Sequence, residues 1–298
     1  MVFVNILLPV FLMAFSGFLV GKFTSIKSDG IVKAVFYVLS PCMIFDSLYS
    51  QQVSGQAILK LIVFVVLLHF ILFMIGFGLF KILGWDNDSR VAGTLSLFLN
   101  NSGNYGLPVL LFAFGNAGFQ FGVLYVVIHA ALQVVIGVGI SSWKEGMRVG
   151  KLLLNIIRVP WLYALIIALA LRVTNTVLPD SLVAPVEMLG QAAIPVMLML
   201  LGIQLAELQI TAVLPRASLV SALKLALPPF LAWGLTAILG IDGLLRAVLI
   251  IEGSTPAAVN ALLLSLQYKR RPDLTASVLL ITTLGSLATM TVLLMLLT

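Results

Sequence analysis

The stretch NNSGNYGLP, residues 100–108, lies between two apolar runs, TLSLF at 94–98 and VLLFAFG at 109–115. Its asparagines prefer water, its glycines loosen a helix, and Pro108 lacks the N–H that a helix interior needs. Such a segment predicts a break inside an otherwise apolar helix. At membrane depth, backbone without helical hydrogen bonds is tolerated only where protein or a water-filled cavity satisfies it. The break is therefore expected to line a cavity.

The composition is that of a membrane protein. Of the 298 residues, 61% are hydrophobic and 9% are charged, whereas roughly a quarter of the residues of a soluble domain are charged. Apolar runs of about 20 residues recur, each long enough to cross a hydrocarbon core. The first run has no positively charged residues before it and is interpreted as a helix, not a signal peptide. We predict an all-α membrane protein with ten transmembrane helices, at about 3–21, 31–50, 57–81, 91–113, 118–142, 153–172, 180–206, 215–239, 243–267 and 273–297.

The positions of the basic residues predict the topology. With the N-terminus outside, most Lys and Arg side chains fall at cytoplasmic loops and helix ends, as the positive-inside rule requires. Both termini are then outside, and the net charge of +6 indicates topology, not nucleic-acid binding. The single Cys42 excludes a disulfide framework and a cysteine metal site. The predicted cytoplasmic set is Lys22, Lys27, Lys33, Lys81, Arg90, Lys144, Arg148, Lys151, Arg158, Arg216, Lys269, Arg270 and Arg271.

The chain divides into two halves of five predicted helices, 1–142 and 153–298, joined by a short cytoplasmic connection at 143–152. Because each half has an odd number of crossings, two related halves must be inverted relative to each other. Proline marks corresponding helices: Pro41 matches Pro195, and Pro108 matches Pro256. Inverted repeats with breaker residues in corresponding helices are typical of secondary transporters and indicate where the binding site lies.

The two breaks, at 100–108 and 252–256, predict an anion site. Pro108 is expected to release the carbonyl of Asn104, and Pro256 that of Glu252. Thr255 followed by Pro256 is typical of an N-cap and a first helical residue. Two half-helix N-termini that meet at the midplane offer unpaired N–H groups to an anion. The competing interpretation is that the prolines only kink packed helices. The predicted substrate-binding residues are Asn101, Ser102, Asn104, Tyr105, Pro108, Ser254, Thr255, Pro256 and Asn260.

Few ionisable residues lie deep in the predicted helices, and such residues are functional candidates by default. Glu252 can bind a coupled cation or proton, or be a buried acid kept neutral or paired with Lys224. Lys224 can attract an anionic substrate or extend its long side chain to the interface. For His69 and His129 we favour an ordinary interhelical hydrogen bond.

The segments NNSGNYGLPVLL, EGSTPAAVNALLLSLQYKRRPDLTAS and VFYVLSPCMIF resemble the auxin efflux carrier family, which includes plant auxin carriers and bacterial proteins described as malate or malonate permeases. The resemblance covers essentially the whole chain. It implies a fold similar to bile acid sodium symporters, a scaffold and a transport domain with elevator-like motion, crossing helices four and nine, a homodimer, and a bacterial-type plasma membrane. It matches Asn104, Pro108, Pro256 and Lys224 to family positions. The short central loop departs from the long loop of many plant members.

We therefore predict a carrier of small organic anions, either monocarboxylates or dicarboxylates of the malate type. It is not expected to be an enzyme, and no metal or cofactor is expected. Sodium or proton coupling is left open, and a coupled symporter of the bile acid type is the alternative within transport. A channel is a further option. The alternative from another class is an intramembrane serine protease with Ser102 as nucleophile and His129 as base, which requires those side chains within hydrogen-bond reach.

Overall fold

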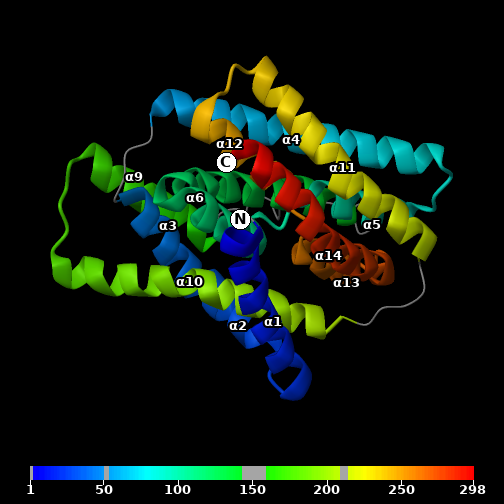
Figure 1. Ribbon diagram of the computed structural model, residues 1–298, viewed down its shortest axis with the longest axis horizontal. Coiled ribbons are helices and arrows are strands. Elements are labelled where there is room, and N and C mark those ends of the chain that lie inside the picture. Colours follow the sequence, from blue (N-terminus) through cyan, green and yellow to red (C-terminus); the bar gives the residue numbers. More distant parts are fainter. Residues whose placement is uncertain (1–2, 50–53, 143–158, 209–213) are drawn as a thin grey trace.

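The computed structural model describes residues 3–49, 54–142, 159–208 and 214–298, and the elements in these ranges are helical (Figure 1). In chain order they are η1 (Phe3–Leu7), α1 (Leu8–Phe23), α2 (Ser28–Ala34), η2 (Val35–Leu39), α3 (Ser40–Tyr49), α4 (Gly55–Ile82), α5 (Asn87–Phe98), η3 (Ser102–Gly106), α6 (Leu107–Leu132), η4 (Gln133–Val138), α7 (Gly139–Ser141), α9 (Pro160–Val173), α10 (Asp180–Ala206), α11 (Leu214–Ile238), α12 (Gly243–Gly253), α13 (Val259–Gln267) and α14 (Pro272–Leu297). The η elements are π-helical turns that continue into their neighbours.

Within the described residues, seven helical runs are long and apolar enough to cross a membrane, which confirms an all-α membrane protein. The count differs from the ten predicted helices for a physical reason. The predicted spans 91–113 and 243–267 are each split by a break into shorter helices, and α9 covers only Pro160–Val173. The whole predicted connection 143–152 and the start of the span 153–172 lie outside the described residues.

The predicted helices 91–113 and 118–142 are joined without a loop, because the chain turns back at Gly115. Gly115 has φ 61° and ψ −159°, a backbone conformation that other residues rarely adopt. A β-carbon on Gly122 would touch the side chains of Leu107 and Leu110. In a straight helix, residues 12 to 15 positions apart lie roughly 20 Å apart. The helical run 102–141 is therefore two antiparallel arms.

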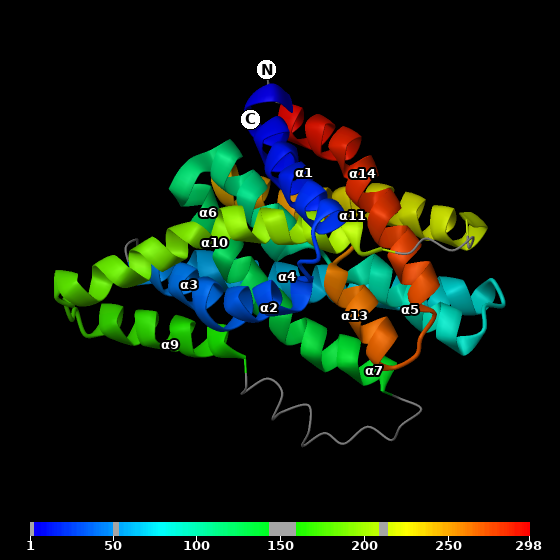
Figure 2. The same ribbon diagram turned by 90° about the horizontal axis from the view of Figure 1, so that it is seen from below.

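The helices form two packed groups. In the first, α1 packs along α10, and α3 packs against α9 and α10; the second contains α4, α5, α6 and α11 to α14. Figure 1 shows α10 crossing α1 along one edge of the protein while α4 and α11 lie along the other. The N- and C-terminal ends come close together in both views (Figure 2). The close crossing of α1 and α10 depends on glycine at the contact, since a β-carbon on Gly202 would overlap the Ala14 carbonyl.

Ionic contacts tie helix ends together in the second group. The buried Arg270 donates to Asp88 at 2.6 Å and to the Ser141 carbonyl at 2.7 and 2.9 Å, joining α5, α7 and the start of α14. Asp86 caps the N-terminus of α5 by accepting from the Ser89 amide at 2.9 Å. Hydrogen bonds from the Ser89 hydroxyl and amide lower the pKa of Asp86 to about 2, assisted by the nearby Arg216. These contacts fix the ends of the helices that carry the breaks.

The α1–α10 crossing generates a prediction about stability. Gly202→Ala places a methyl group against the Ala14 carbonyl and the Phe18 amide nitrogen, both backbone atoms that cannot move aside cheaply. Overpacking of this kind typically costs about 1–3 kcal/mol, so the melting temperature in detergent is expected to fall. Gly78→Ala on α4, whose β-carbon would meet nothing within 4 Å, is the matched control. Equal melting temperatures for the two variants would contradict the packing described here.

Candidate functional site

The two breaks meet and pair with each other at the centre of the protein. The first break lies between α5 and η3, and the second between α12 and α13. Asn100 and Ala257 form an antiparallel bridge, in which the Asn101 amide donates to the Pro256 carbonyl at 2.9 Å and the Ala258 amide donates to the Leu99 carbonyl at 3.0 Å. Each unwound segment thereby satisfies backbone groups of the other, so the crossing is a short two-stranded contact between helices.

The positions of the breaks correct two predictions. The first break ends before Pro108: the helix restarts at Ser102, and Pro108 lies six residues further along, in α6, which continues from η3 without interruption. Thr255 is not the N-cap of the second half-helix; Ala258 is, and α13 begins at Val259. The reason is the bridge, which holds residues 256–258 extended because their backbone groups bond to the first break. Thr255 instead donates its hydroxyl at 3.0 Å to the Glu252 carbonyl that Pro256 leaves free.

Asn100 holds the crossing together, although the sequence analysis did not select it. Its side-chain nitrogen donates to the carbonyls of Glu252 at 3.0 Å and Gly253 at 2.9 Å, and to the Tyr125 hydroxyl at 3.2 Å. Its side-chain oxygen accepts from Lys224 Nζ. The amide therefore links α6, α11 and the end of α12. Its position in the sequence could have identified it: Asn100 is the first polar residue after α5, where unpaired carbonyls at the helix C-terminus are expected to need a donor.

Lys224 points into the protein, so the interpretation that it extends to the interface is wrong. The residue is fully buried on α11, and Nζ donates to the Leu97 carbonyl at 2.9 Å as well as to Asn100. Cations are favourable at a helix C-terminus, where carbonyl oxygens carry partial negative charge. Lys224 thus supplies a positive charge at the end of α5.

A pocket of about 390 Å³ lies against the crossing and is lined by the N-terminal residues of both second half-helices. Ser102, Gly103 and Asn104 begin the first, and Val259 and Asn260 begin the second. The remaining wall contains aromatic residues of η2 and α9 and polar residues of α6 and η4; its other lining residues are Phe36, Tyr37, Asn100, Asn101, Val126, His129, Ala130, Gln133, Val134, Val159, Trp161 and Ala258.

The predicted site residues divide into two sets. Asn101, Ser102, Asn104 and Asn260 line this pocket. Tyr105 does not: its ring packs edge-on to Phe11 and its hydroxyl accepts from Ser286 at 3.0 Å. The others are buried and do not line the pocket either, and these are Pro108, Lys224, Glu252, Ser254, Thr255 and Pro256.

Ser102 and His129 lie within hydrogen-bond reach, as a serine protease would require. The distance from Ser102 Oγ to His129 Nδ1 is 3.1 Å, and the backbone N–H of Asn100 donates to His129 Nε2 at 3.4 Å. If Nε2 accepts, the proton of a neutral imidazole is on Nδ1, so His129 donates to the serine. A general base must instead accept the serine proton. The pair therefore serves the interhelical hydrogen bond that we expected for His129.

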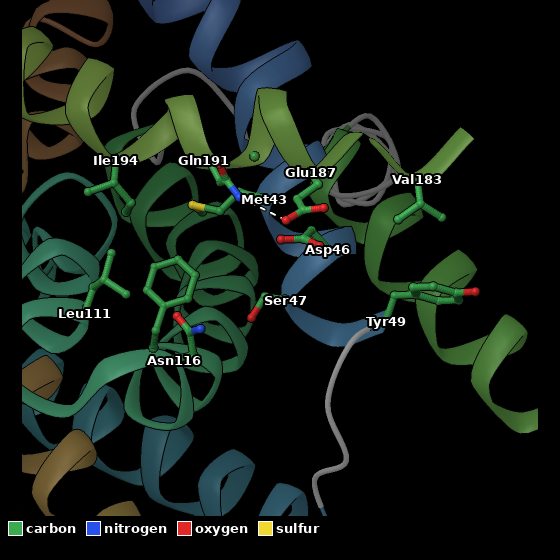
Figure 3. Close-up of a pocket in the computed structure, with 12 residues that line it drawn as sticks. Met43, Asp46, Ser47, Tyr49, Leu111, Asn116, Val183, Glu187, Gln191 and Ile194 are labelled. Carbon is green, nitrogen blue, oxygen red and sulfur yellow. Dashed lines mark hydrogen bonds between the residues drawn. The ribbon is translucent and has the colours of Figure 1, made fainter. Parts of the chain in front are cut away.

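A second pocket of about 630 Å³ lies at the opposite end of the α2–α3 helix (Figure 3). Asp46 and Glu187 lie next to each other at its wall, and Gln191 donates to Glu187 at 3.0 Å. Asn116 on α6 also faces it. Two carboxylates repel an anion, so this larger pocket is a poor site for one.

Comparison with known proteins identifies the family. Residues 2–144 and 146–294 match the family described as "Membrane transport protein". The chain belongs to this family, the auxin efflux carrier family of the sequence analysis. It is 28% identical to an uncharacterized transporter of Methanothermobacter thermautotrophicus, over 87% of this chain and 85% of the relative. It is 27% identical to an uncharacterized transporter of Methanocaldococcus jannaschii, over 90% and 92% of the two chains. The protein is therefore a membrane transporter, and the family indicates no enzyme activity.

The bonds of Asn100 generate a prediction about the transporter's stability. Asn100→Ala removes its side-chain hydrogen bonds and leaves the buried Lys224 with one partner fewer; loss of a hydrogen bond to a charged group is typically worth about 1.5–3 kcal/mol. We expect a large drop in melting temperature, and Asn116→Ala, a truncation of the same residue type in the second pocket, is the control. Adding Lys224→Met to Asn100→Ala should recover part of the loss, because the buried ammonium is then absent. An Asn100→Ala variant that melts like Asn116→Ala would refute this role.

Proposed function

We propose that the protein is a carrier of small organic anions that binds a carboxylate in the 390 Å³ pocket at the crossing. The observation that carries this proposal is the convergence of two half-helix N-termini, at Ser102 and Val259, on one pocket. Unpaired N–H groups and the helix dipole favour an anion there without a fixed positive charge. The Asn101 side-chain nitrogen, which has no partner among the described residues, is a further donor.

The lining favours a monocarboxylate with an apolar body. None of the residues that line the pocket is Lys or Arg, so one carboxylate uses the available N–H groups. A second carboxylate would lie against Phe36, Tyr37 and Trp161 without a cation to neutralise it. Trp161 donates its indole N–H to the Phe36 carbonyl at 3.1 Å, which fixes this aromatic wall. Dicarboxylates of the malate type are thus the less favoured class.

The position of the pocket supports alternating access by an elevator-like motion. One wall comes from η2 and α9 of the first helix group, and the other from η3, α6 and α13 of the second. We infer that the first group is a scaffold and the second a transport domain, built from inverted repeats at 1–142 and 153–298. The break in each half supports the repeat. On the predicted topology the pocket faces the cytoplasm, and a homodimer remains an expectation from the family.

Transport direction depends on coupling. For an uncoupled monoanion, outward movement releases roughly 2.3 kcal/mol per 100 mV when the interior is negative, so a uniporter would export. A symporter with one sodium ion or proton moves no net charge with a monoanion, and its direction is set by the ion gradient. This coupled symporter is the alternative within the same site.

The test is uptake of radiolabelled acids into proteoliposomes, with indole-3-acetate, benzoate and malate as probes. Asn104→Ala removes an amide from the pocket wall, and Pro256→Ala alters the break that the bridge needs. Loss of a hydrogen bond to a charged group is worth about 1.5–3 kcal/mol, so on the order of 10- to 100-fold weaker apparent affinity is expected for Asn104→Ala. Pro256→Ala is expected to impair transport while the protein still inserts.

Asn116→Ala, which alters only the second pocket, is the matched control and should transport like the wild type. The proposal fails if the Asn104 and Pro256 variants keep wild-type rates and affinities. It also fails if Asn116→Ala alone is impaired, since the second pocket would then be the site.

A further inference from the structure

The side chain of Glu252 occupies a closed niche between α12 and the α6 arms. The residue has no exposed surface, and neither carboxyl oxygen has a hydrogen-bond partner among the described residues. A β-carbon on Gly106 would collide with this carboxyl group, and one on Gly122 would lie 3.2 Å from Oε1. Leu107 and Leu110 reach the same place. Two glycines thus make room for a carboxyl group that no described residue binds by a hydrogen bond.

An ionised carboxylate is not compatible with this niche. Burial of an unpaired charge costs several kcal/mol even after relaxation, and the group takes up a proton instead. No hydrogen bond joins the Glu252 carboxyl group to a titratable side chain of the described helices packed against α12, and α14 contributes no charged residue after Asp273. The deep titratable groups on these helices have other hydrogen-bond partners, and of them Tyr125 also interacts electrostatically with Glu252. They are Tyr105 on η3, Tyr125 and His129 on α6, His69 on α4 and Lys224 on α11. Lys60, Lys81 and Arg216 lie near the ends of α4 and α11.

The described residues around Glu252 do not provide a set of free oxygen ligands for a sodium ion either. Half-helix ends and unwound carbonyls are the usual ligands for coupled sodium in transporters with broken helices. Here the Leu97 carbonyl binds Lys224 at 2.9 Å, and the carbonyls of Glu252 and Gly253 bind Asn100 at 3.0 and 2.9 Å. The described residues also contain no group of three His, Cys, Asp or Glu side chains that could hold a metal ion.

We propose that Glu252 is the coupling site, and that it carries a proton across the membrane together with the anion. This inference rests on the proposed anion carrier. The niche touches the substrate pocket through η3: Gly106, packed on the carboxyl group, ends the turn that Ser102 begins and in which Asn104 lies. An ionised Glu252 repels an anion in the pocket and requires water where Gly106 packs. The neutral form therefore binds the anion better. Glu252 takes up its proton on the side where the anion binds and releases it on the side where the anion leaves, so one proton accompanies each monoanion and no net charge crosses in a full cycle.

The first experiment needs no substrate. The infrared spectrum of the reconstituted protein at neutral pH should contain the carbonyl stretching band of a protonated carboxylic acid, and Glu252→Gln should lack it. The other acidic residues in the described ranges are exposed or only partly buried, whereas Glu252 is fully buried, so the band is assigned by this difference. A spectrum without the band refutes the inference, whether or not the protein carries any anion.

The second experiment measures indole-3-acetate binding between pH 6 and pH 8.5, where the probe itself stays ionised. Once the pH is high enough for Glu252 of the substrate-free protein to ionise, binding takes up one proton, so wild-type affinity should then weaken with rising pH, approaching tenfold per pH unit. Glu252→Gln cannot ionise, so its pH dependence should vanish. Solid-supported-membrane recordings should show little net charge movement for the wild type and a negative charge per turnover for Glu252→Gln.

Three results overturn the inference: pH-independent binding by the wild type, an unchanged pH dependence in Glu252→Gln, or a sodium requirement that disappears in that variant. A paired test addresses the niche without a glutamine. Gly106→Ala should weaken indole-3-acetate binding because its methyl group collides with the carboxyl group, and Glu252→Ala added to it should relieve the collision. If no acid binds at any pH while the infrared band is present, the proposed function fails and the protonated Glu252 stands.

Discussion

The architecture depends on one exchange of hydrogen bonds between two unwound segments. Residues near 100 and 257 are separated by more than half the chain, yet their backbone groups pair as in an antiparallel sheet. In hydrocarbon an unpaired amide or carbonyl costs several kcal/mol, so neither helix can break at this depth alone. Because each break supplies the partners of the other, both can open at the same place. The pocket exists because the restarted helices diverge from this contact.

Side chains form hydrogen bonds with the backbone carbonyls that the bridge leaves unpaired. Carbonyls at the end of α12 accept hydrogen bonds from the Asn100 side chain, and the carbonyl of Leu97 at the end of α5 accepts one from Lys224. In the two restarted helices, which begin at η3 and α13, the N-terminal residues line the pocket instead. Donors therefore gather on one side of the crossing and acceptors on the other, where a cationic side chain already satisfies them. Under the proposed function, this polarity favours a negative charge in a pocket that no Lys or Arg residue lines.

The sequence predicted the membrane class, the two breaks and four of the residues that line the pocket, since each follows from local chemistry. Apolar length and the polar run at 100–108 are visible without a structure. The exact ends of the breaks were not predictable, because they depend on pairing between distant segments: Thr255 has the composition of an N-cap, but the bridge keeps the following residues extended. Asn100 and Asn101 are adjacent and identical in type. Only the geometry of the crossing shows that the Asn100 side chain binds carbonyls and Lys224, whereas the Asn101 side-chain nitrogen has no partner among the described residues. The turn at Gly115 lies between the predicted spans 91–113 and 118–142, where the sequence analysis placed a connection, although the structure needs no loop there.

The bridge also constrains how the protein can be made. Helices enter a membrane in order of synthesis, and the end of α5 is complete long before residues 256–258 emerge. Until then the carbonyl of Leu99 and the amide of Asn101 have no partners from the second half, and Lys224 has not yet reached Leu97. The helices of the first half must therefore satisfy these groups in another way until then. The native centre of the molecule cannot form before the second half has been synthesised, although it begins one third of the way along the chain.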